Sequence, residues 1–118
     1  MTIETTQPAI VSSPEDVQRR SYMTALSLAA QIMGETHALP NSFEVIVHPW
    51  APAKPELRFY FHRDVPSMRQ FRDDQMLTET MEPREDGSVY CEAVREDVWG
   101  VRVVAWTLTD AKAPAVAA

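Results

Sequence analysis

Apolar residues recur near the start of the chain at the spacing of an amphipathic helix. The stripe consists of Val17, Tyr22, Ala25, Leu26, Ala29, Ile32 and Met33. Ser13 before it is a good N-cap, Pro14 suits the first helical position, and Glu15 and Asp16 favour the helix dipole. Gly34 is a candidate terminator. We therefore expect a helix over about residues 14–36.

The pattern then changes to alternation. Residues 43–48 and 57–63 alternate in polarity and are rich in β-branched and aromatic side chains, which is typical of strands. Pro49, Pro52 and Pro55 make the segment between them a stiff loop without internal pairing. The two segments are therefore expected to form a hairpin.

Asp64 is a candidate cap for a second helix with Pro66 in its first turn. Its inner side is expected to carry Met68, Phe71, Gln75 and Met76, and its solvated side Arg69, Arg72, Asp73 and Asp74. Residues 77–82, 88–95 and 98–109 read as strands, and the last is expected to be the longest. The turn signals between them are residues 83–87 and the pair Glu96-Asp97.

This order of elements predicts an α+β two-layer sandwich. We expect an antiparallel sheet of four or five strands with two helices on one face, in the order α-β-β-α-β-β-β. Residues 13–109 would form the single domain, 1–12 a flexible N-terminal arm and 110–118 a disordered tail. The element order is similar to that of roadblock-type dimerisation domains.

Alternation assigns each strand side chain to one of two faces. The face expected under the helices is wholly apolar and carries Phe43, Val45, Val47, Leu57, Phe59, Phe61, Val89, Cys91, Ala93, Val101, Val103 and Ala105. The opposite face is mixed and carries Glu44, Ile46, His48, Arg58, Tyr60, His62, Tyr90, Glu92, Val94, Arg102, Val104, Trp106 and Leu108.

The charge and cysteine content narrow the function classes. The formal net charge of −6 disfavours contact with phosphate backbones, so nucleic acid is not the expected partner. Cys91 is the single cysteine, so an intrachain disulfide is impossible. The N-terminus lacks the pattern of a secretory leader, and no stretch approaches the roughly 18 apolar residues of a membrane span. The expected location is the cytoplasm, without membrane contact.

The sequence lacks the residue patterns that several kinds of binding and catalysis require. The three glycines are widely separated, so a phosphate-binding loop is absent and no cofactor is expected. His48 and His62 would lie at opposite ends of the first hairpin, which argues against a shared metal site. Cys91 has apolar neighbours on its face and is expected to be a core residue rather than a nucleophile.

Leu39-Pro40 after the long first helix and the run 100–106 near the end, Gly-Val-Arg-Val-Val-Ala-Trp, carry a family resemblance. In these residues the chain resembles small proteins carried by actinobacterial integrative elements and phages. The resemblance implies an accessory role and supplies no activity.

The mixed sheet face is the candidate functional surface, because aromatic residues and arginine dominate the energetics of protein interfaces. We predict a non-enzymatic interaction or regulatory accessory module, a homodimer or a binder of another protein. The candidate partner-binding residues are Tyr60, His62, Tyr90, Glu92, Arg102 and Trp106.

Three other interpretations of this face stay open. The N-terminal arm or the loop 49–55 could cover it. Its aromatic residues could stack bases of a single-stranded nucleic acid. A cluster of Tyr60, His62, Glu92 and Arg102 could make it a small-molecule-binding or weakly enzymatic surface, with histidine as the base.

Overall fold

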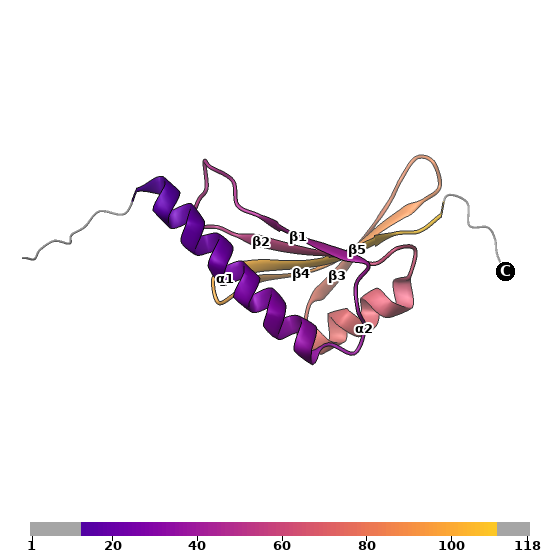
Figure 1. Ribbon diagram of the computed structural model, residues 1–118. Helices are drawn as coiled ribbons and strands as arrows, with labels where there is room; N and C mark the ends of the chain where they lie inside the picture. Colours follow the sequence, from indigo (N-terminus) through magenta and orange to yellow (C-terminus); the bar gives the residue numbers. More distant parts are fainter. Residues whose placement is uncertain (1–12, 111–118) are drawn as a thin grey trace, which may run out of the picture.

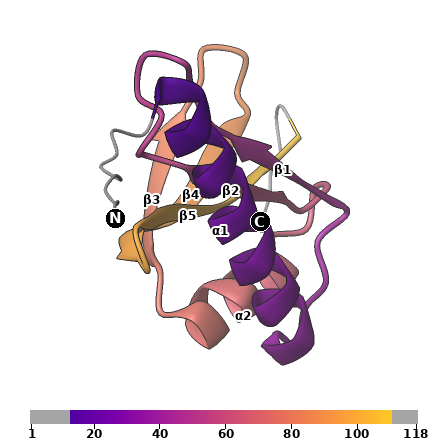
Figure 2. The ribbon, with the colours of Figure 1, turned by 60° about the vertical axis from the view of Figure 1, so that its left-hand side comes forward.

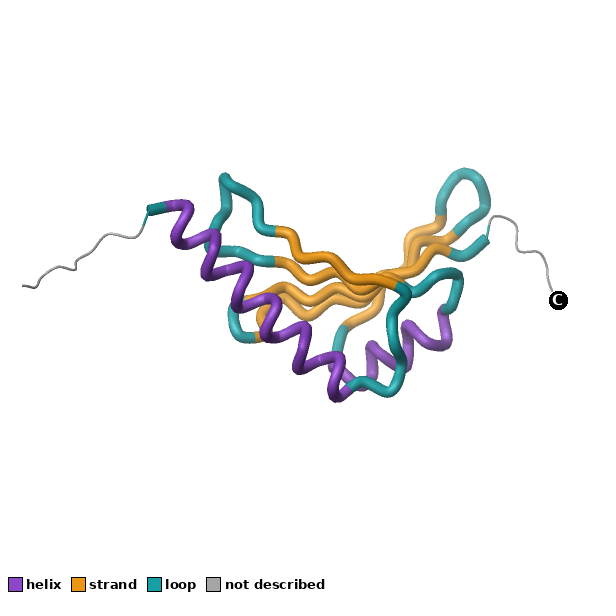
Figure 3. Tube along the Cα trace, in the orientation of Figure 1, coloured by secondary structure: helices purple, strands orange, loops and turns teal. Residues whose placement is uncertain are grey.

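The structure, a computed structural model, describes residues 13–110. The expected arm 1–12 lies outside the described residues, as does the expected tail after Asp110. Two helices lie on one face of a five-stranded sheet, and no helix of the described residues covers the other face (Figures 1 and 3). The predicted α+β two-layer architecture and its element order are confirmed.

Helix α1 (Pro14–Glu35) begins as its sequence predicts. The Ser13 hydroxyl accepts a hydrogen bond from the Asp16 backbone N–H at 3.1 Å, and Pro14 occupies the first turn. Gly34 lies inside the helix rather than terminating it, and Thr36 is the C-cap. The buried stripe also differs from the prediction and consists of Ser21, Ala25, Leu28, Ala29 and Ile32. Tyr22 and Leu26 therefore lie on an exposed flank.

The strands are β1 (Ser42–Ile46), β2 (Glu56–Tyr60), β3 (Thr78–Pro83), β4 (Val89–Val98) and β5 (Val101–Leu108), and their order across the sheet is β1-β2-β5-β4-β3. Three of the pairs are antiparallel, but β2 and β5 are parallel. The expectation of a wholly antiparallel sheet was wrong at this pair. Helix α2 (Val65–Gln75) carries the chain across the sheet from β2 to β3, and two hairpin reversals then bring β5 back in the direction of β2.

The β4–β5 turn lies later than predicted. Strand β4 continues through Glu96 and Asp97, with a bulge between Arg95 and Val98, and the chain reverses at Trp99-Gly100. Both turn residues have positive φ, 55° and 83°, which is the type I′ geometry that matches the twist of a hairpin. As a result β4 is the longest strand, not β5.

The core lies between the sheet and the helices, where the sequence predicted it. The strand residues Leu57, Phe59, Cys91, Ala93, Val101, Val103 and Ala105 are buried there, together with Phe61 just after β2. Helix α1 lies against β1 and β2, and α2 lies against β5 and contributes Met68 and Phe71. Met76, expected on the inner side of α2, is instead exposed at its left-handed C-cap. Phe43 is the other exception, because it lies on the edge strand β1 and is 43% exposed.

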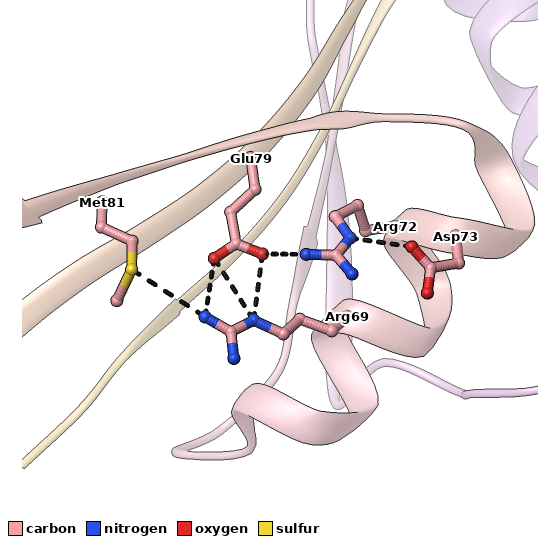
Figure 4. A network of polar contacts seen from close by, with 5 residues as sticks. All are labelled: Arg69, Arg72, Asp73, Glu79 and Met81. Carbon is pink, nitrogen blue, oxygen red and sulfur yellow. Dashed lines mark hydrogen bonds and ion pairs between the residues drawn. The ribbon is translucent and has the colours of Figure 1, made fainter.

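Glu79 of β3 ties α2 to the sheet (Figure 4). Its carboxylate accepts hydrogen bonds from the Arg69 guanidinium at 2.8 and 3.1 Å, and it also pairs with Arg72. The two arginines were expected to be solvated and are instead bound to this carboxylate. The C-terminal ends of α1 and α2 lie close together (Figure 2). Asp74 of α2 links them, because its carboxylate accepts a hydrogen bond at 2.8 Å from the backbone N–H of His37, just after α1.

The pairing at Glu79 should make stability depend on pH. Its hydrogen bonds, first to Arg69 and then to Arg72, hold the pKa of the Glu79 carboxyl below its ordinary value of 4.5. This stabilisation is present above that ordinary value and is lost as the pH falls through the lower pKa of the folded state. Glu79→Gln should lower the free energy of unfolding in urea at pH 7 by about 1–2 kcal/mol and flatten its decline in acid. Glu82→Gln, at an exposed position of the same strand, should change it by less than about 0.5 kcal/mol; equal losses would contradict this role.

Gly34 and Gly100 should respond to alanine in opposite directions. A Cβ at either position would meet no atom within 4 Å, so only backbone conformation matters. Gly34→Ala should stabilise the protein by up to about 1 kcal/mol, because alanine favours the helix. Gly100→Ala should destabilise it by about 1–2 kcal/mol, because its φ of 83° is unfavourable for an L-residue. Thermal unfolding measures both, and changes of the same sign would contradict the assignment.

Candidate functional site

The candidate site is the sheet face without helices, here called the open face. It carries Glu44 and Ile46 on β1; Glu56, Arg58 and Tyr60 on β2; Arg102, Val104, Trp106 and Leu108 on β5; Tyr90, Glu92 and Val94 on β4; and Thr78, Thr80 and Glu82 on β3. The register sets which of these are neighbours. Trp106 lies opposite Tyr60 on one side and opposite Glu92 on the other.

Aromatic rings gather at the centre of the open face. The Trp106 ring centroid lies 4.5 Å from that of Tyr60 and 5.8 Å from that of Tyr90. The Arg58 guanidinium lies over the Trp106 ring, 5.7 Å from its centroid. These three rings and the arginine are called the aromatic cluster below. Arg58 and Tyr60 lie on β2, Tyr90 on β4 and Trp106 on β5. The pairing of these three strands therefore assembles the cluster.

Carboxylates surround the cluster and neutralise its arginine. The Arg58 guanidinium donates to a Glu56 oxygen at 3.0 Å and to the Tyr90 hydroxyl at 2.9 Å. The Tyr90 hydroxyl donates to Glu92 at 2.8 Å. Burial raises the pKa of the Tyr90 phenol above its ordinary value, so this group stays protonated and able to donate. The cluster is therefore held rigid by contacts within the chain.

Five of the six predicted site residues come together. Tyr60, Tyr90, Glu92 and Trp106 belong to the cluster or its carboxylates, and His62 Nδ1 lies 2.6 Å from the Tyr60 hydroxyl. Arg102 lies four residues along β5 from Trp106, about 13 Å at the rise of a strand, and is linked to the cluster through Glu56, which pairs with both Arg58 and Arg102. The residues proposed for a weakly enzymatic surface are thus divided between two regions.

Arg102 belongs to a separate hollow at one end of the sheet. Its guanidinium pairs with Glu56 at 3.3 Å and with Glu96 at 3.1 Å. These residues, with His48, line a cavity of about 470 Å³ beside the β4–β5 turn. His48 stacks on Trp50 with 4.5 Å between the ring centroids, whereas His62 lies at the other end of the hairpin, as the sequence predicted.

Sequence reasoning missed two contributors. Glu56 was not assigned to a strand, because the strand was expected to begin at Leu57, after Pro55. Arg58 was assigned to the correct face but not to the candidate set, although it touches Glu56, Tyr90 and Trp106. Val104, which was expected on the mixed face, lies on it but is fully buried. The open face is consequently more polar than the prediction.

The geometry also bears on phosphate binding, metal binding and thiol chemistry. Arg58 and Arg102 are both paired with carboxylates, so neither is free to meet a phosphate. Among residues 13–110, no three His, Cys, Asp or Glu side chains group closely enough to hold a metal ion. Cys91 is buried in the core as predicted, and burial raises the pKa of its thiol above its ordinary value.

Comparison with known proteins gives no relative for this chain, since no family model, curated protein or solved structure matches it. Neither helix of the described part is long and apolar enough to cross a membrane. Function is therefore inferred from the structure of the open face itself.

Arg58 should hold the open face together energetically. Its side chain is 21% exposed and neutralises neighbouring carboxylates, so Arg58→Met removes the cation beside Glu92 and leaves Glu56 paired with Arg102 alone. The free energy of unfolding in urea should fall by about 1–2 kcal/mol. Arg95→Met, at an exposed position of β4, is the matched control and should cost less than about 0.5 kcal/mol. A neutral Arg58→Met variant would contradict the proposed network.

Proposed function

We propose that the protein is a non-enzymatic interaction module of accessory or regulatory type, which associates through its open face with a second copy of itself. The observation that carries the proposal is the aromatic cluster on a sheet face that no helix of residues 13–110 covers. A two-layer fold leaves such a face in water unless another surface meets it. The chain has one cysteine and can form no intrachain disulfide, which suits a cytoplasmic location.

The composition of the open face supports a protein partner. Tyrosine, tryptophan and arginine are the residue types that contribute most to interface energies, particularly when they lie at the centre of the contact. Trp106 occupies that central position between Tyr60 and Tyr90. Because the cluster is already held rigid, little side-chain entropy would be lost on binding.

The charge of the open face supports a second copy. Arginines and carboxylates are interspersed, with Arg58 and Arg102 among Glu44, Glu82 and Glu92. A twofold contact brings the same patch from both copies together, so a surface with both signs can oppose unlike charges. A surface of one sign would repel its own copy. The same face could instead hold a different protein, which is the second form of the proposal.

Trp106→Glu should weaken self-association and leave the fold intact, because Trp106 is only partly buried within one chain. Loss of a central tryptophan costs about 2–4 kcal/mol, which corresponds to a rise in the dissociation constant of roughly 30- to 1000-fold. Light scattering across a dilution series gives the mass, and circular dichroism checks the fold.

Trp50→Glu is the matched control. It makes the same chemical change at a tryptophan that is 79% exposed in the β1–β2 loop, away from the open face. The control should associate like the wild type. Equal masses for wild type and a folded Trp106→Glu variant would contradict self-association through the open face. If the wild type is a monomer, the remaining form of the proposal is that the open face binds a different protein.

A further inference from the structure

The two edges of the sheet differ in how they are protected. An edge strand presents unpaired N–H and C=O groups, and proteins usually block such edges with charges or proline. Strand β3 is blocked in this way, since it carries Glu79 and Glu82 and ends at Pro83. Strand β1 has neither lysine nor proline, and Glu44 is its single charged residue. Its edge is therefore open to another strand.

Helix α1 adds an apolar flank on the same side. Tyr22 and Leu26 are 38% and 46% exposed and lie one turn apart. They continue the row that begins at Gln18, whose side-chain amide donates to the Val47 carbonyl at 2.9 Å, just beyond β1. The row Gln18, Tyr22, Leu26 therefore lies on the β1 side of the helix.

The other flank of α1 has a different character and lies toward the β4–β5 turn. Arg20 and Thr24 line a hollow with Trp99 and Gly100 of the β4–β5 turn. The helix is thus apolar toward the sheet edge and polar toward the turn. The eight residue steps from Gln18 to Leu26 along the helix span about 12 Å, close to the length of about 13 Å for the four extended steps from Val47 to Phe43.

Phe43 extends this apolar surface onto β1. Its side chain lies on the helix-covered face and contacts Phe59, with 5.7 Å between the ring centroids, yet it is 43% exposed. Nothing in residues 13–110 lies beyond it on that side, because β1 is the edge strand. The backbone of β1, with Phe43, Tyr22 and Leu26, is called the edge strip below.

We propose that the edge strip binds the edge strip of a second copy, with the two β1 strands antiparallel and Val45 on the twofold axis. The inference goes beyond the proposed use of the open face and does not depend on it, since it uses a different surface. It joins two five-stranded sheets into one of ten strands.

The sequence of β1 is compatible with a second copy paired at Val45 and disfavours pairing at Glu44. Directly opposed residues of antiparallel strands share a face, so the two sheets continue each other only if the axis passes through a residue. An axis at Glu44 would oppose two like charges, which is unfavourable. An axis at Val45 places Glu44 opposite Ile46 and Phe43 opposite Val47, without like charges. The strand is thus complementary to itself.

The edge axis is perpendicular to the sheet, so both open faces stay on the same side of the joined sheet. Contact through the open face uses an axis in the plane of the sheet. If both contacts form and the two perpendicular axes intersect, they generate four copies, as two ten-stranded sheets packed face to face.

Phe43→Lys tests the edge contact, because a charged side chain on an edge strand opposes pairing. The matched control is Met81→Lys, a similar change at a residue 53% exposed on the other edge strand, β3. Phe43→Lys should halve the mass found by light scattering for the wild type and raise the dissociation constant at least tenfold, whereas Met81→Lys should change neither. A monomeric wild type, or a folded Phe43→Lys variant of unchanged mass, would overturn the proposal.

The four masses separate this proposal from the proposed function. If both hold, the wild type has four copies, Phe43→Lys and Trp106→Glu each have two, and the double variant has one. If only the edge contact exists, the wild type has two copies and Trp106→Glu does not change that number. If only the open face is used, Phe43→Lys has no effect and the edge proposal fails.

Cysteine cross-linking tests the register without relying on Phe43. Val45→Cys should form a disulfide between two copies under mild oxidation, because opposed residues of paired strands lie within disulfide reach. Glu44→Cys should form it at least tenfold more slowly. The native Cys91 is buried and should not interfere. Faster cross-linking through position 44 would overturn the Val45 axis, and no cross-link at either position would overturn the edge contact.

Discussion

The parallel pairing of β2 with β5 is the interaction on which the rest of the structure depends. It places β5 at the centre of the sheet, between strands that lie far apart in the sequence. Because side chains alternate along β5, this strand contributes to both faces of the sheet. Val101, Val103 and Ala105 are buried in the core, whereas Trp106 projects from the opposite face. Tyr60 and Tyr90 reach Trp106 because they lie on the two strands that pair with β5.

The sequence predicted the elements and their faces well, because these are local properties. A period of two along each strand identified the buried positions, and the caps at Ser13 and Asp64 identified the helix starts. Strand order is not local. The parallel pair arises from the path of the chain through α2 and two hairpins, and no residue of β2 or β5 signals it. The turn at Trp99 was missed because tryptophan is an unusual residue at positive φ.

The site was predicted in part for the same reason. The aromatic residues of the open face follow from alternation, but their contacts follow from register. The pairing of Arg58 with Glu56 and Tyr90 required knowledge of which strands are neighbours. These contacts change the chemistry of the face, since arginines that are already neutralised suit a protein surface better than a phosphate. The edge contrast between β1 and β3 likewise becomes visible only once the strand order is known.

If a second copy covers the open face, as we propose, Trp106 loses its contact with water on association. The most direct measurement is therefore the solvent accessibility of Trp106 itself. Replacing Trp50 and Trp99 by phenylalanine leaves Trp106 as the one tryptophan of the chain. Its fluorescence quenching by acrylamide is then followed from high to low protein concentration, with the mass measured in parallel. If the open faces pair, quenching of Trp106 increases as the mass falls. Quenching that stays constant while the mass falls to that of one copy would contradict burial of the open face between copies.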